Sequence, residues 1–292
     1  MLFIATVMWS VLFAGNLNAK ETVQIKGSDT LINLVQRLAE VYMQEHKIDI
    51  AVTGGGSGTG IAALLNKKTD IADSSRSIKA KELKKAKKKG ITVKSVAIAM
   101  DGLSVIANGK NPVKSLTIDQ LGKIYRGEVT NWKEMGGPDL NITLYGRQSN
   151  SGTFVFFRKV VLKADYSQKM LRMNGNSQIV EGVKKDKGGI GYVGVGYIKD
   201  KNTGGVSKGI SVLKIAKDEQ SIPGSPLDVK AVTSGTYPLV RPLFQYISSG
   251  VKKDASQFIK WELSDAGQDL AVKMGFYPVA EEYKKHNKEN GF

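Results

Sequence analysis

The chain has 292 residues, of which 41% are hydrophobic and 24% charged, proportions that are typical of a globular protein and exclude bulk disorder. Its 43 basic and 27 acidic residues give a net charge of +16, which indicates an anionic partner such as nucleic acid, an acidic membrane surface or a small anion. The absence of cysteine and the presence of only two histidines exclude disulfides, thiolate or His-rich metal sites and a Cys nucleophile. We therefore expect no metal, no cofactor and no catalytic residues.

The N-terminal segment, residues 1–19, contains no charged side chain. Residues 2–14 form an apolar run, and Leu17-Asn18-Ala19 places a small residue before a cleavage point at Lys20. The run is shorter than the roughly 20 residues of a membrane-spanning helix, although no basic residue precedes it as in most signal peptides. We expect residues 1–19 to be a signal peptide, and the mature protein to be periplasmic and, without cysteine, not lipidated.

The first part of the mature chain alternates between strand and helix patterns. Apolar residues at helical spacing run through 31–44, between β-rich segments at 22–26 and 48–52. A glycine-rich segment at 54–60 precedes a helix that opens at 61–65, and residues 70–72 have the pattern of a buried strand. This alternation predicts an α/β fold with mainly parallel sheets.

The remainder of the chain contains two candidate crossings between lobes. Residues 93–107 form one long β-rich stretch, and the glycine-flanked segment 188–194 is the candidate for the return. Between and after them the patterns predict helices at 118–125, 154–162 and 254–274 and strands at 142–145 and 237–247. We expect lobe 1 to comprise residues 20–102 and 198–292, and lobe 2 to comprise residues 103–197.

The basic charge is concentrated in residues 79–89, which contain seven lysines. This run is most simply a solvated helix face. No aromatic residues interleave with it, as a platform for single-stranded nucleic acid requires, so we expect no nucleic-acid partner.

Four segments combine glycine or serine residues with a preceding strand. They are Gly27-Ser28-Asp29-Thr30, Gly56-Ser57-Gly58-Thr59-Gly60, Ser74-Ser75-Arg76 and Ser151-Gly152-Thr153. Glycine lets an anion approach the backbone, Ser and Thr add hydroxyl donors, and a helix N-terminus carries a positive partial charge. Each segment alone is an ordinary helix cap, but together they predict one oxyanion site.

Two arginines, Arg76 and Arg147, are the charged candidates for this site, because a guanidinium can contact two oxygens of a tetrahedral anion at once. The sequence Gly58-Thr59-Gly60-Ile61-Ala62-Ala63 also fits a relaxed dinucleotide-binding pattern, which is frequent by chance in glycine-rich loops. The phosphate-cradling pattern G-x-x-x-x-G-K-[ST] of nucleotide hydrolases is absent.

At these residues the sequence resembles the phosphate-binding subunit of the high-affinity phosphate ABC transporter, over residues 21–281. The resemblance rests on the segments above and on Asp101-Gly102-Leu103, Gly189-Ile190-Gly191-Tyr192-Val193 and Tyr237-Pro238-Leu239-Val240-Arg241-Pro242-Leu243. It implies a two-lobed, type II periplasmic binding fold that closes over phosphate without catalysis and delivers it to membrane permease subunits, as a monomer.

The resemblance also assigns the ligand-contacting positions to Ser28, Thr30, Ser57, Ser75, Arg147, Ser151, Gly152 and Thr153, with Arg76 and Asp101 in motifs of its glycine-rich branch. An acidic residue often lies beside the binding arginine in this family, whereas Arg147 is followed by Gln148 and Ser149.

The identity of the anion depends on a buried carboxylate. Phosphate retains a proton that an ionised carboxylate accepts, whereas fully ionised sulfate leaves that carboxylate unpaired. Asp101 is the first candidate for this acceptor and Asp73 the second. Two alternatives remain: a protein that binds or senses another oxyanion such as sulfate or molybdate, and an exported phosphatase.

Overall fold

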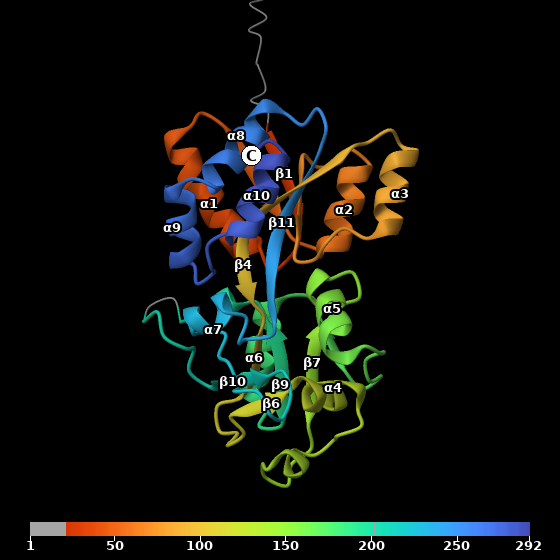
Figure 1. The fold of residues 1–292 in the computed structure, drawn as a ribbon, viewed down its shortest axis with the longest axis vertical. Helices are drawn as coiled ribbons and strands as arrows, with labels where there is room; N and C mark the ends of the chain where they lie inside the picture. The colour runs from red at the N-terminus through yellow and green to blue at the C-terminus, as the bar shows by residue number, and fades with distance from the viewer. Residues whose placement is uncertain (1–21, 201–202) are drawn as a thin grey trace, which may run out of the picture.

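The computed structural model describes residues 22–200 and 203–292, so the predicted signal peptide lies outside the described part of the chain. Figure 1 shows two lobes joined by strands β4 (Val93–Gly102) and β11 (Val240–Ser248). Among the described residues, no helix has both the length and the apolar character that crossing a bilayer requires.

Lobe 1 is the lobe built on a five-stranded sheet of order β2-β1-β3-β11-β4. Strand β1 runs parallel to both β2 and β3, whereas β11 runs antiparallel to β3 and β4. Its other strands are β1 (Thr22–Gly27), β2 (Asp49–Thr53) and β3 (Ile71–Ser74). Its helices are α1 (Ile32–Glu45), α2 (Ser57–Leu65), α3 (Ala80–Lys88), α8 (Lys253–Glu262), α9 (Asp265–Lys273) and α10 (Glu281–Glu289).

Lobe 2 is the lobe built on a six-stranded sheet of order β6-β10-β5-β9-β7-β8. These strands are β5 (Ser104–Asn108), β6 (Ser115–Thr117), β7 (Thr143–Arg147), β8 (Leu171–Met173), β9 (Gly189–Val193) and β10 (Ile210–Ala216). The helices are α4 (Ile118–Arg126), α5 (Gly152–Phe157), α6 (Asn176–Lys185) and α7 (Val229–Thr233), with a π-helical turn at Arg158–Leu162 and 3₁₀ turns at Trp132–Met135 and Val195–Tyr197.

Both sheets are mixed in direction. The strands that lead into the predicted oxyanion segments, β1, β3 and β7, have parallel neighbours, as expected. The antiparallel pairs all involve β5 or β11, the strands that follow the two crossings.

The first crossing lies where the sequence predicts it, since β4 ends at Gly102 in lobe 1 and β5 begins at Ser104 in lobe 2. The predicted return at 188–194 and the boundary at residue 197 are wrong. Strand β9 lies inside the sheet of lobe 2, and β10 pairs with β5 and β6 of the same lobe, so the chain returns only at Leu239–Val240. The glycines of β9 serve packing instead, because a Cβ on Gly191 would lie 2.4 Å from Ile179 Cγ2 of α6.

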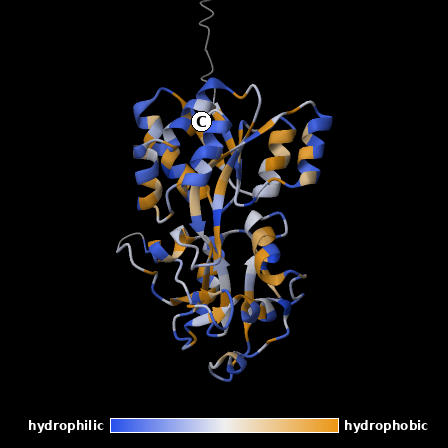
Figure 2. Cartoon of the chain, viewed as in Figure 1, coloured by the Kyte–Doolittle hydropathy of each residue, from blue (hydrophilic) through white to orange (hydrophobic). Residues whose placement is uncertain are grey.

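The other predicted elements hold with small shifts. Helix α1 buries Leu34, Leu38 and Tyr42, the apolar positions at helical spacing. The predicted helix 254–274 is two helices, α8 and α9, because Ser264 begins a new helix and its Oγ accepts the amide of Gly267 at 3.4 Å. The lysine run forms α3, which buries only Ala86 and is coloured as largely hydrophilic in Figure 2.

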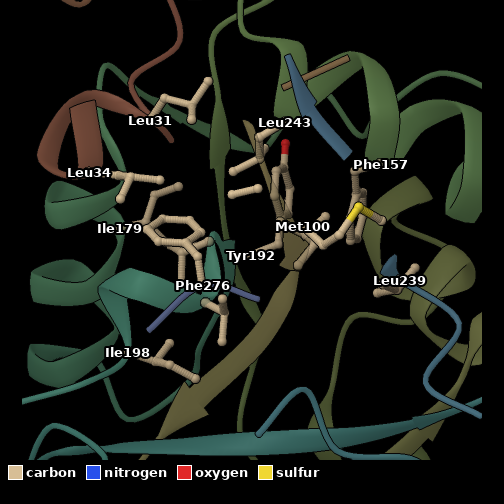
Figure 3. Packing of buried hydrophobic residues seen from close by; sticks show 14 of the residues in the cluster. Leu31, Leu34, Met100, Phe157, Ile179, Tyr192, Ile198, Leu239, Leu243 and Phe276 are labelled. Atoms are coloured by element: carbon tan, nitrogen blue, oxygen red, sulfur yellow. The ribbon is translucent and has the colours of Figure 1, made fainter. Parts of the chain in front are cut away.

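The hydrophobic core is continuous between the lobes. Figure 3 shows Leu31 and Leu34 from the start of α1, Ile179 from α6, and Met100 and Leu239 from the crossing segments as members of one buried cluster. The two lobes therefore pack against each other, and the ends of β1, β3 and β7 meet at their interface.

Candidate anion-binding site

Five hydroxyl groups from both lobes meet in the interface, and all five side chains are buried. Ser28 and Ser75 lie 3.0 Å apart, Thr30 and Thr153 lie 2.8 Å apart, and Ser75 Oγ lies 3.3 Å from Thr153 Oγ1. Ser57 completes the group at 3.4 Å from Ser75 Oγ. We call these residues, Ser28, Thr30, Ser57, Ser75 and Thr153, the hydroxyl cluster.

The local backbone explains why these side chains converge. Ser28, Ser75 and Thr153 follow the carboxyl ends of β1, β3 and β7, where open α/β sheets place their ligands. Ser57 is the first residue of α2, and its Oγ accepts the backbone N–H of Ser75 at 3.1 Å. This hydrogen bond joins the loop that follows β2 to the loop that follows β3.

Gly152 brings the backbone of lobe 2 close to two hydroxyls of lobe 1. A Cβ at this position would lie 2.4 Å from Ser57 Oγ and 2.7 Å from Ser75 Oγ. These distances are shorter than any normal contact, so only glycine allows the lobes to approach this closely.

Arg147, at the end of β7, is 1% exposed and enters the interface from lobe 2. Its Nη2 donates to Asp29 Oδ2 at 2.5 Å and to the carbonyl of Asn174 at 2.7 Å, whereas its Nε and Nη1 have no partner among residues 22–200 and 203–292. A buried cationic donor without an acceptor is costly, so these two nitrogens, which carry three N–H groups, favour an anion beside the loop that holds Ser28 and Thr30.

The carboxylate that supports Arg147 comes from Asp29 in lobe 1, between Ser28 and Thr30, and not from a sequence neighbour of the arginine. Asp29 Oδ1 also accepts the backbone N–H of Gly55 at 2.8 Å. Lobe 2 further contacts this loop through Asn176, whose Nδ2 donates to the Asp29 carbonyl at 3.1 Å. The loop that carries two cluster hydroxyls is therefore held by lobe 2.

A second set of inter-lobe hydrogen bonds involves Asn150, in the loop after β7. Its carbonyl accepts the N–H of Gly58 at 2.9 Å, and its Nδ2 donates to the carbonyl of Gly55 at 2.9 Å. These contacts close the glycine-rich loop over the interface, so the structure has its lobes closed.

Three predicted site residues do not point their polar groups into the cluster. Ser151 is buried, but its Oγ accepts the amide of Phe154 at 3.4 Å and caps α5. Arg76 turns away from the cluster and forms a two-point ion pair with Glu82 at 2.7 and 2.8 Å. Asp73 lies across from Gln245 of β11, and burial raises the pKa of its carboxyl to about 7.

Asp101, at the end of β4, is fully buried beside the cluster. Its Oδ2 accepts Nε and Nη2 of Arg241 at 3.0 and 2.8 Å, and its Oδ1 accepts the backbone N–H of Val195 in lobe 2 at 2.8 Å. The first candidate acceptor is therefore ion-paired, with Oδ1 the less occupied oxygen.

Several residues that the sequence did not assign to the site contribute to it. They are Asp29, Asn150, Asn174, Asn176 and Arg241. Asp29 and Arg241 lie inside the quoted motifs, and Asn150 directly precedes Ser151, whereas nothing in the sequence distinguishes Asn174 or Asn176.

Two closed lobes that enclose hydroxyl and guanidinium donors define a two-lobed protein that binds a small anion. Comparison with known proteins agrees. The profile of the PBP superfamily domain matches residues 14–266. The chain is 35% identical over 254 residues to the phosphate-binding protein PstS of Staphylococcus haemolyticus, covering 83% of this chain and 77% of the relative. It is 32% identical over 268 residues to protein SphX of Synechococcus elongatus, covering 88% and 77%.

Among solved structures, a putative phosphate ABC transporter substrate-binding protein with bound phosphate from Clostridium perfringens is similar, with a TM-score of 0.77, 29% identity and coverage of 89% of this chain and 100% of the other. An ABC-type phosphate transport receptor from Vibrio cholerae has a TM-score of 0.69 and 29% identity, with 88% and 100% covered. The chain belongs to the PBP superfamily and, within it, to the family of the phosphate-binding protein PstS.

Proposed function

We propose that this protein binds inorganic phosphate between its two lobes and delivers it to the permease of an ABC transporter. The observation that supports this most directly is the buried guanidinium of Arg147, which pairs with Asp29, between Ser28 and Thr30, and whose Nε and Nη1 have no partner in the described part of the chain. Hydroxyl and guanidinium groups together supply the donors that four phosphate oxygens require.

Discrimination against sulfate rests on a carboxylate acceptor in this proposal, and Asp101 is the residue that fits. An ionised Asp101 accepts a hydrogen bond from the O–H group of phosphate. Sulfate has no O–H group at neutral pH, so it would leave the buried carboxylate without that hydrogen bond. Its burial and its position beside the cluster favour this role, since Arg241 Nη2 donates both to Asp101 Oδ2, at 2.8 Å, and to Thr153 Oγ1, at 3.0 Å. Asp73 does not suit the role because its carboxyl faces Gln245.

The proposal places the protein outside the cytoplasmic membrane, as a non-lipidated periplasmic carrier that acts as a monomer. The predicted signal peptide and the relationship to substrate-binding proteins support export. The protein has no catalytic role in this proposal, because binding and lobe closure suffice for delivery.

Isothermal titration of the mature protein with phosphate and, separately, with sulfate at pH 7.5 tests this function. We expect one phosphate per monomer and much weaker sulfate binding. Tight sulfate binding would indicate a carrier for another tetrahedral oxyanion, and the absence of phosphate binding would contradict the proposal. Release of phosphate from a phosphate ester by the purified protein would indicate an exported phosphatase instead.

A further inference from the structure

The motif Tyr237–Leu243, on which part of the family resemblance rests, spans the return crossing between the lobes, and only its arginine has appeared in the site described so far. Its central polar residue, Arg241, is 2% exposed. Arg241 lies directly opposite Asp101 in the antiparallel pairing of β11 with β4, so the two strands that connect the lobes are joined by an ion pair.

The rest of the motif strengthens the same junction. The hydroxyl of Tyr237 donates to the carbonyl of Leu103, and the N–H of Leu103 donates to the carbonyl of Leu239 at 2.9 Å. These hydrogen bonds join the two crossing segments to each other at the boundary between the lobes. The guanidinium of Arg241 is therefore held at a fixed position relative to the hinge.

From this position Arg241 contacts both lobes. Its Nη1 donates to the carbonyl of Ser75 in lobe 1 at 3.0 Å, and its Nη2 donates to Thr153 Oγ1 in lobe 2 at 3.0 Å. The guanidinium carbon also lies 5.1 Å from the ring centroid of Phe156 in lobe 2, within cation–π range. Since Arg241 belongs to the sheet of lobe 1, its contacts with lobe 2 depend on lobe closure.

The contact with Thr153 has a chemical consequence. A guanidinium has donors only, so the oxygen of Thr153 must accept from Arg241 and its own proton remains to be donated elsewhere. Thr153 is also within hydrogen-bond distance of Thr30 and Ser75 in the hydroxyl cluster. Arg241 thereby turns the hydroxyl of Thr153 into a donor toward the interior of the cluster, as an anion requires.

We propose that Arg241 is a positioning residue that couples anion binding to lobe closure, by orienting the Thr153 hydroxyl and by holding the Asp101 carboxylate across the hinge. It acts through these two residues. The inference rests on the proposed function, because phosphate is the anion whose binding it aids.

A double-mutant cycle tests the coupling. Phosphate affinity is measured by titration calorimetry for the wild type, Arg241→Gln, Thr153→Val and the double variant. We expect each single substitution to weaken phosphate binding at least tenfold, and the double variant to bind no more than about threefold more weakly than the poorer single variant. Independent losses that multiply in the double variant, or wild-type affinity in Arg241→Gln, would overturn the proposal.

Small-angle X-ray scattering provides a readout that a purely structural role of Arg241 would not change. At saturating phosphate we expect the wild type to contract fully and Arg241→Gln to contract only in part, with a lower phosphate-to-sulfate affinity ratio. Full contraction with an unchanged ratio would show that Arg241 supports only the fold. Arg37→Gln removes an exposed arginine paired with Glu40 on α1 and is the matched control, expected to behave as the wild type.

Two safeguards keep the test decisive. If Arg241→Gln does not fold, Thr153→Val removes the same contact from lobe 2 without leaving Asp101 unpaired, and wild-type phosphate affinity in that variant would overturn the proposal. If the wild type binds sulfate and not phosphate, the proposed function fails, and the same cycle with sulfate still decides whether Arg241 and Thr153 are coupled.

Discussion

Asp29 of lobe 1 and Arg147 of lobe 2 form an ion pair across the interface, with Asp29 Oδ2 and Arg147 Nη2 2.5 Å apart. The carboxylate contacts only Nη2 of the guanidinium, so Nε and Nη1 remain available to the anion. The same contact therefore orients the binding arginine and joins the lobes. Lobe closure and anion recognition therefore both depend on the side chain of Arg147.

Replacement of Asp29 by Asn should weaken phosphate binding by about tenfold. The amide keeps the shape of the side chain but loses the charge, and one charge-assisted hydrogen bond contributes about 1.5–3 kcal/mol. Titration calorimetry measures the affinity. Glu128→Gln, which breaks the exposed pair of Glu128 with Arg126, should leave it unchanged. Equal affinities in Asp29→Asn and the wild type would exclude a role for this pair in binding.

Arg147→Ala should weaken phosphate binding by about a hundredfold or more. The substitution removes two charge-assisted donors from the site, and each 1.4 kcal/mol corresponds to a factor of ten. Equilibrium dialysis with labelled phosphate measures so large a change. Arg158→Ala, an exposed arginine paired with Asp165, serves as control. A loss smaller than tenfold would place the anion elsewhere.

Gly152→Ala should hinder closure of the lobes and weaken phosphate binding by more than tenfold. The added methyl group would meet Ser57 Oγ and Ser75 Oγ at 2.4 and 2.7 Å, so either the lobes stay apart or the hydroxyl cluster rearranges. Gly136→Ala is a poorer control because Gly136 has a positive φ, whereas Gly175 has extended backbone and open space at its Cβ. Gly175→Ala should therefore bind phosphate normally. Scattering with and without phosphate would reveal a failure to contract.

Asp101→Asn should reduce the preference for phosphate over sulfate. The amide can donate to sulfate, which the carboxylate cannot, and it no longer requires a proton on the ligand. The ratio of the two dissociation constants is the measurement, and it should fall toward one. Because this substitution would leave the buried Arg241 without its counter-charge, we also expect a lower melting temperature. An unchanged ratio would assign the acceptor role to another residue.

Asp73→Asn should stabilise the protein at alkaline pH. Burial raises the pKa of Asp73 to about 7 from 3.8, so between pH 4 and 7 the folded protein holds a proton that the unfolded chain releases, and stability falls as pH rises through this range. The neighbouring Glu262 has its pKa raised by burial and by Asp73. Asn cannot ionise and avoids this loss, which amounts to at most about 4 kcal/mol at 1.4 kcal/mol per pKa unit.

Urea unfolding at pH 4.5 and at pH 8 measures the effect. The gain in free energy of unfolding should be about 1 kcal/mol at the lower pH and largest at the higher one. Asp139→Asn, at an exposed position, should show no such dependence on pH. An equal gain at both values would mean that Asp73 is ionised throughout.

Most of the elements and most of the hydroxyl cluster could be predicted because they depend on local chemistry. Apolar periodicity marks α1, and serine or threonine beside glycine marks the loops that follow β1, β3 and β7. Convergence of those loops follows from parallel strands, whose carboxyl ends share one edge of a sheet. The first crossing was visible as well, since one β-rich stretch was too long for a single strand.

The order of residues along the chain is therefore enough to predict the two-lobed α/β fold, the donors at the ends of the strands and their preference for an oxyanion. Which charges face that anion depends on how the folded chain brings distant residues together. Arg76 carries the same guanidinium as Arg147, but Glu82 lies within its reach and turns it away. Asp29 and Arg241 gained their roles from partners 118 and 140 residues distant. The energy of an ion pair depends on the distance between the charges in space, and separation along the chain does not give that distance.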